Sequence, residues 1–120
     1  MRTLGRTGLQ VSELALGGLF VSGIGGEFEQ ARGAILRAFE LGVNFVDTAP
    51  SYHNSEEVLG RVLPEVTQPV ILSTKLGGRP KPFNPQDKDG LLFSVEESLR
   101  LLKRDHIDVL MVHEPDRSGQ

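Results

Sequence analysis

Hydrophobic positions along the chain follow two patterns that alternate from one end to the other. Short runs in which most residues are apolar predict strands covered on both faces, because such strands show no clean polar alternation. Longer stretches in which apolar residues recur every three or four positions predict amphipathic helices. The predicted strands cover residues 14–20, 43–49, 69–76 and 107–115.

The first predicted helix follows a glycine-rich loop at residues 22–30. In this helix apolar residues recur at Ala31, Ile35 and Ala38, and Gly42 stands where a helix C-cap would fall.

The other two helices have less regular boundaries. Asn54 and, three residues later, Glu57 resemble a capping box, which predicts a helix start, and Pro64 is expected to end or kink that helix. A loop rich in proline and glycine over residues 77–90 precedes a third helix, predicted up to about Leu102.

The order of these elements indicates the fold class. Residues 3–12 predict a short hairpin around Gly5 and Gly8, followed by three strand–helix pairs and a fourth strand. Such alternation favours an α/β fold with a parallel sheet and right-handed crossovers. It fits a doubly wound open sheet or part of a (β/α) barrel. The glycine-rich stretch after the first strand lacks the GxGxxG spacing of a dinucleotide-binding turn, which favours the barrel.

Composition narrows the function classes. With 120 residues, 38% hydrophobic and 24% charged, the chain has the balance of one ordinary globular domain. A net charge of -3 gives no basic surface for nucleic acid. Cysteine is absent, which excludes disulfides and thiolate chemistry and suits a reducing compartment. Neither a signal peptide nor a membrane-length apolar run is recognisable, so we expect a cytoplasmic protein.

Three predicted strands end in an ionisable residue: Asp47, Lys75 and His113. Each alone has an ordinary explanation, as a capping carboxylate, a lysine reaching out of the strand end, or a structural histidine. Together they are more informative, because parallel strands lie about 4.8 Å apart and their carboxyl ends meet at one edge. We expect the three side chains to converge on one site.

Tyr52, the only tyrosine of the chain, lies in the predicted loop after Asp47. Asp47 can hold Lys75, and the positive charge of Lys75 favours the phenolate form of a nearby tyrosine. Such a tyrosine can donate a proton to a carbonyl oxygen while hydride adds to the carbon, or accept one in reverse. His113 could hydrogen-bond the same oxygen. This pattern predicts an oxidoreductase.

Other polar residues carry weaker signals. His53 and His106 lack metal-ligand spacing, and no metal site is predicted. Glu114 and Asp116 are interpreted as solvated residues at a loop start. Arg79, with Lys81, could contact an anionic substrate, but a solvated loop is the favoured interpretation.

Four stretches of the chain resemble the N-terminal part of the aldo-keto reductases: LGRTGLQVSELALGG (4–18), FVDTAPSYHNSEEVLG (45–60), ILSTK (71–75) and SLRLLKRDHIDVLMVHEPD (98–116). The resemblance implies a (β/α)8 barrel whose bottom is closed by an N-terminal hairpin. It implies reduction of aldehydes or ketones, or oxidation of alcohols, with NADPH and less often NADH.

The resemblance also assigns residues. It makes Tyr52 the acid–base tyrosine, and it places Gly18, Leu19 and Asp47 near the nicotinamide. The remaining catalytic members that it implies are Asp47, Lys75 and His113. One departure is His53, which stands where the family usually has glycine after the tyrosine.

A complete barrel of this type takes about 250 residues. Residues 1–120 are therefore expected to be a single domain: the hairpin, four strands and three helices of the N-terminal half. Residues that stack the nicotinamide and bind the adenosine phosphate would come from later strands. The alternative is an inactive half-barrel that self-associates through exposed strand edges or serves as a binding or regulatory module. The joint presence of the four chemical residues favours an enzyme.

Overall fold

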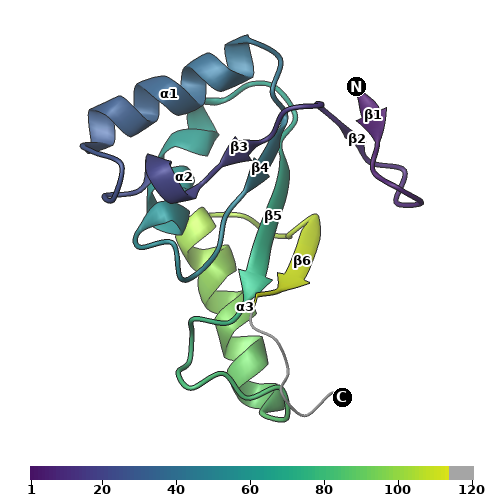
Figure 1. Cartoon of the computed structure of the whole chain (residues 1–120), viewed down its shortest axis with the longest axis vertical. Coiled ribbons are helices and arrows are strands. Elements are labelled where there is room, and N and C mark those ends of the chain that lie inside the picture. The colour runs from purple at the N-terminus through teal and green to yellow at the C-terminus, as the bar shows by residue number, and fades with distance from the viewer. Residues whose placement is uncertain (114–120) are drawn as a thin grey trace.

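A computed structural model describes residues 1–113. Its main sheet contains four parallel strands arranged in the order in which they occur along the chain (Figure 1). The strands are β3 (Leu16–Gly17), β4 (Phe45–Asp47), β5 (Ile71–Leu76) and β6 (Val109–Val112). A doubly wound sheet reverses its strand order at a switch point. Because no reversal occurs here, the right-handed crossovers all pass over one face, as in a (β/α) barrel.

The three helices are α1 (Phe28–Glu40), α2 (Ser55–Val62) and α3 (Lys88–Leu102). They lie together on one side of the strands (Figure 1). Short 3₁₀ turns, η1 (Leu19–Val21) and η2 (Leu63–Glu65), follow β3 and α2. The core between helices and sheet is formed by fully buried apolar side chains such as Ile35, Val46, Leu59, Val62, Leu72 and Leu102.

Strand register separates the residues of the core from those of the site. Val46 of β4 is paired with Leu72 of β5, and both side chains belong to the core on the helix side. Side chains alternate between faces along a strand, so Asp47 and Lys75 point to the opposite face. This face would be the inside of a barrel.

The N-terminal hairpin pairs β1 (Arg2–Thr3) with β2 (Gln10–Val11) in antiparallel fashion, as predicted. Asn44, just before β4, holds it in place: its side chain accepts from Ser12 N–H (2.7 Å) and donates to the Gln10 carbonyl (2.8 Å). The hairpin therefore lies near the amino ends of the strands, away from the site (Figure 1).

The first strand is much shorter than the predicted 14–20, because the chain turns directly after Gly17. A Cβ on Gly18 would lie 2.6 Å from Ser55 Oγ and 2.7 Å from Thr48 Oγ1, so only glycine permits this approach. Gly18 N–H donates to the Asp47 carbonyl (2.7 Å), and η1 begins at the next residue.

The predicted capping box at Asn54 is wrong, although α2 does begin at the next residue. The Asn54 side chain makes no hydrogen bond to the helix; its Oδ1 accepts from Gly23 N–H (2.7 Å) in the loop before α1. A long-range partner has displaced the local one. The α1 boundary was predicted correctly: Gly42, with a φ of 96°, follows the C-cap.

Candidate active site

A bidentate ion pair between Lys75 and Asp47 is the centre of the site. Lys75 Nζ lies 3.0 and 2.9 Å from the two Asp47 carboxylate oxygens and 2.7 Å from the Thr48 carbonyl oxygen. An ammonium group has three N–H donors, and here each has an acceptor. Complete pairing explains how Lys75 can be only 9% exposed inside a strand. The Asp47 side chain is 32% exposed, so its carboxylate is the open side of the pair.

Tyr52 lies in the loop between β4 and α2 and is half-buried. Its ring centroid is 4.9 Å from Lys75 Nζ, within the range of a cation–π contact. Two backbone hydrogen bonds shape this loop: Tyr52 N–H donates to the Ala49 carbonyl (3.1 Å), and Ser55 N–H donates to the Tyr52 carbonyl (2.9 Å).

His113 directly follows β6, and its N–H donates to the Leu76 carbonyl of β5 (2.8 Å). Its ring packs edge-on against Tyr52, with centroids 5.5 Å apart and an interplanar angle of 88°. His113 Nδ1 lies 3.2 Å from Ser51 Oγ. This contact leaves Nε2 for a further partner. Sequence reasoning missed Ser51; its only signal was its position beside Tyr52.

The predicted cofactor residues lie at the neighbouring strand end. Gly18 is buried and bonded through its N–H to Asp47, and Leu19 is half-buried as the first residue of η1. The structure thus brings Asp47, Lys75, Tyr52 and His113 into one cluster, with Gly18 beside it. The arrangement sets a phenol between an ammonium group and an imidazole at the carboxyl ends of parallel strands.

The remaining candidates lie elsewhere. His53 is exposed, with a φ of 50°, and its Nδ1 is 3.0 Å from Asn54 Oδ1. His106 is exposed at the opposite end of the sheet. Its hydrogen bond to Asp105, followed by the negative charge of Asp108, raises the pKa of His106 above its usual value.

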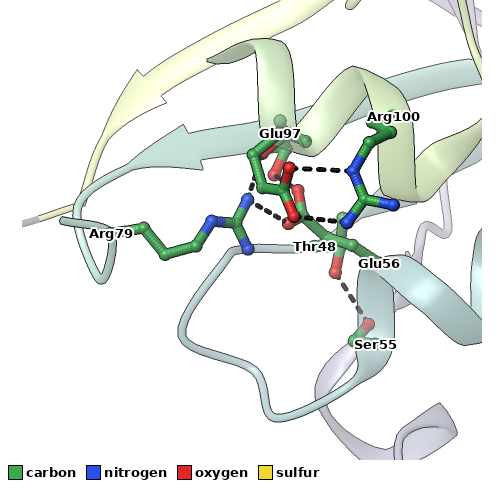
Figure 2. A network of polar contacts seen from close by, with 8 residues as sticks. Thr48, Ser55, Glu56, Arg79, Glu97 and Arg100 are labelled. Carbon is green, nitrogen blue, oxygen red and sulfur yellow. Dashed lines mark hydrogen bonds and ion pairs between the residues drawn. The ribbon is translucent and has the colours of Figure 1, made fainter. Parts of the chain in front are cut away.

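In the loop after β5, the structure contradicts the interpretation of Arg79 as a solvated cation. Arg79 points inward, where Nη2 donates to Glu56 Oε1 (2.8 Å) and Ser98 Oγ (2.9 Å), so it is not a solvated loop residue (Figure 2). Lys81 is exposed. Glu114 and Asp116 lie outside the described residues.

Residues 1–113 offer neither a metal site nor a membrane-spanning helix. No three histidine, cysteine or acidic side chains lie close enough together there to hold a metal ion. No helix in this part of the chain has both the length and the apolar character needed to cross a membrane.

The parallel strands in chain order, with helices on one side, define part of a (β/α) barrel with polar side chains clustered at the strand ends. Comparisons with known proteins identify the family. The sequence profile of the Aldo/keto reductase family matches residues 13–120. The chain therefore belongs to the aldo/keto reductase family of oxidoreductases.

Individual relatives agree with this assignment. L-galactose dehydrogenase of Arabidopsis thaliana is 34% identical over 95% of this chain and 38% of its own length. The 6-dehydroglucose reductase of Novosphingobium aromaticivorans is 34% identical over 96% and 41%. The holo structure of an aldo-keto reductase from Bacillus halodurans superposes with a TM-score of 0.81 at 31% identity, over 98% of this chain and 41% of that one. The chain thus spans less than half the length of these relatives, and it has the partial-barrel form of their fold.

Proposed function

We propose that this protein reduces an aldehyde or ketone to the alcohol, or catalyses the reverse, with Tyr52 as general acid and base. The observation that carries the proposal is the position of the Tyr52 ring, 4.9 Å from the Lys75 ammonium and 5.5 Å from the His113 ring. We also propose that residues 1–120 form one structural unit, the N-terminal half of the barrel.

Each residue has a distinct role in this proposal. Tyr52 Oη protonates the carbonyl oxygen during reduction and takes the proton back during oxidation. Lys75 stabilises the negative charge that remains on the phenol oxygen, and Asp47 keeps the ammonium group in place. His113, held through Nδ1 by Ser51, presents Nε2 to the substrate oxygen and orients it.

The cofactor proposed is NADPH, with NADH as the less common choice in the family. When bound, it supplies the hydride that adds to the carbonyl carbon. The described residues fit its nicotinamide end, because the one-third-exposed Asp47 carboxylate can accept hydrogen bonds from an amide or a ribose hydroxyl. Gly18 and Leu19 would border that end from the neighbouring strand.

The proposal is tested with the full-length gene product that contains residues 1–120. NADPH binding is followed by nicotinamide fluorescence, and turnover by loss of reduced-nicotinamide absorbance over a panel of aldehydes and ketones. Tyr52→Phe is expected to lower kcat by about 10²- to 10⁴-fold and to leave NADPH binding intact. Thr67→Val removes an exposed hydroxyl away from the site and serves as the matched control. Turnover that survives Tyr52→Phe would refute the role of the phenol.

A further inference from the structure

A second buried charge lies behind the candidate site, on the helix side of the sheet. It is Glu56, in the first turn of α2, with a side chain only 3% exposed. Glu56 Oε2 accepts from the Thr74 hydroxyl (2.9 Å), and Oε1 accepts from Arg79 Nη2 (2.8 Å). The same Nη2 donates to Ser98 Oγ of α3 (2.9 Å), so one carboxylate joins α2, β5, α3 and the loop after β5 (Figure 2).

One arm of this network reaches the strand that carries Lys75. Thr74 precedes Lys75 in β5, and the two side chains point to opposite faces. Glu56 therefore holds β5 from behind at the point where Lys75 faces the site. Glu56 also belongs to the helix that begins three residues after Tyr52, and this helix start is bonded to Tyr52 through Ser55 N–H.

The other arm reaches the Tyr52 loop through Arg79. Gly77 and Gly78, with φ values of 113° and 88°, turn the chain sharply after β5. This turn presses Gly78 against Ser51: a Cβ on Gly78 would lie 3.1 Å from the Ser51 Cβ and N. Arg79 follows directly and ties the turn to Glu56.

We propose that Glu56, together with Arg79, is a positioning group that sets the distance between Lys75 and the loop bearing Ser51 and Tyr52. This positioning role rests on the proposed function and deepens it. Glu56 touches no reacting atom. It acts because its two oxygens are bonded to two segments that each lead directly into the site, and because charge-assisted bonds in a buried place permit little movement. Nη2 of Arg79 is engaged by both Glu56 and Ser98.

Kinetics provide the first test, in the full-length gene product. Glu56→Gln and Arg79→Met are expected to lower kcat roughly 10-fold while KM for the carbonyl substrate stays within about twofold, because misplacement by a fraction of an ångström affects the reacting geometry more than binding. The double variant is expected to lose no more than either single variant, since the pair acts as a unit. The controls, Glu65→Gln and Arg32→Met, make the same changes in the exposed Arg32–Glu65 pair and are expected to leave kcat unchanged.

The second test does not depend on activity. NMR of tyrosine-labelled protein reports on the Tyr52 ring, whose resonances are identified by their loss in Tyr52→Phe. They are expected to move in Glu56→Gln and Arg79→Met and to stay in place in Glu65→Gln. Thr74→Val keeps the shape of its side chain, removes one bond to Glu56, and provides a milder variant should the others fail to fold.

The outcomes separate this inference from the proposed function. Folded network variants with wild-type kcat, or with unmoved Tyr52 resonances, would overturn the positioning role. Turnover that survives Tyr52→Phe would overturn the acid–base role and leave the resonance comparison as the deciding result for Glu56. Loss of thermal stability alone, with kcat and resonances unchanged, would make the network purely structural.

Discussion

Replacing Gly60 by alanine is expected to destabilise the protein, although helices intrinsically favour alanine over glycine. Gly60 lies within α2 and is buried. A Cβ at this position would lie 1.9 Å from the Leu101 carbonyl oxygen and 3.1 Å from Leu102 Cα of α3. The glycine therefore allows the two helices to touch backbone to backbone.

The magnitude follows from two opposing terms. Glycine to alanine inside a helix favours folding by about 1 kcal/mol. Overpacking costs typically about 1–3 kcal/mol, and a clash this deep with backbone belongs near the upper end because no side-chain rotation relieves it. The net loss expected for Gly60→Ala is about 2 kcal/mol.

Gly33 in α1 is the matched control, because the same substitution there meets no atom within 4 Å. Gly33→Ala is expected to stabilise the protein by about 1 kcal/mol, so the two variants should differ by roughly 3 kcal/mol and in sign. Urea unfolding followed by circular dichroism measures both changes as shifts of the midpoint at constant m-value. A Gly60→Ala variant at least as stable as the wild type would refute the close approach of α2 and α3.

Three further predictions concern other parts of the chain. Lys75→Met leaves the Asp47 carboxylate without its cation and is expected to abolish turnover and to lower the unfolding free energy by about 1–3 kcal/mol. The loss is smaller than in a fully buried pair because Asp47 is partly exposed. Turnover assays and urea unfolding measure the two effects, and full turnover would contradict the prediction. The bond to Asp105 raises the pKa of His106 in the folded state, so the stabilisation by protonated His106 is complete below the unfolded pKa of about 6.5 and is lost as pH rises through the folded value. His106→Gln should remove this pH dependence of the unfolding free energy. Identical stability–pH curves for the variant and the wild type between about pH 5 and pH 9 would disprove it. Asn44→Ala removes side-chain hydrogen bonds to the hairpin and is expected to lower the unfolding free energy by about 1–2 kcal/mol. Amide hydrogen exchange at residues 10–12 should become faster. Unchanged exchange would argue against a stabilising role of Asn44 in holding the hairpin.

Much of the fold could be predicted from the sequence, because periodicity records which side of each element is buried. The hairpin, the alternation of strands and helices, and the end of α1 shortly before Gly42 all agree with the pattern. A local hydrogen bond was predicted wrongly where a distant residue competes for the same atom, although α2 begins at the expected place. Asn54 has the sequence signature of a cap, yet Gly23, about thirty positions earlier, takes its oxygen.

The residues of the candidate site also fall into those that the sequence could predict and those that it could not. Asp47, Lys75 and His113 could be picked from the sequence because polar residues at the ends of apolar strands meet at one edge of a parallel sheet. Nothing in the local pattern distinguishes Ser51 from any loop serine or Arg79 from a solvated loop cation. Their roles depend on where α2, β5 and the following turn are placed relative to one another.

The sequence by itself determined the order of elements and the chemical groups at the strand ends, since both follow from spacing along the chain. Only the tertiary structure decided that the strands keep their chain order without reversal, and that the Glu56 carboxylate faces inward to join Thr74 with Arg79. The physical reason is that a hydrogen bond or ion pair requires two atoms to meet within about 3 Å. For residues far apart in the chain, that distance is set by the packing of whole elements.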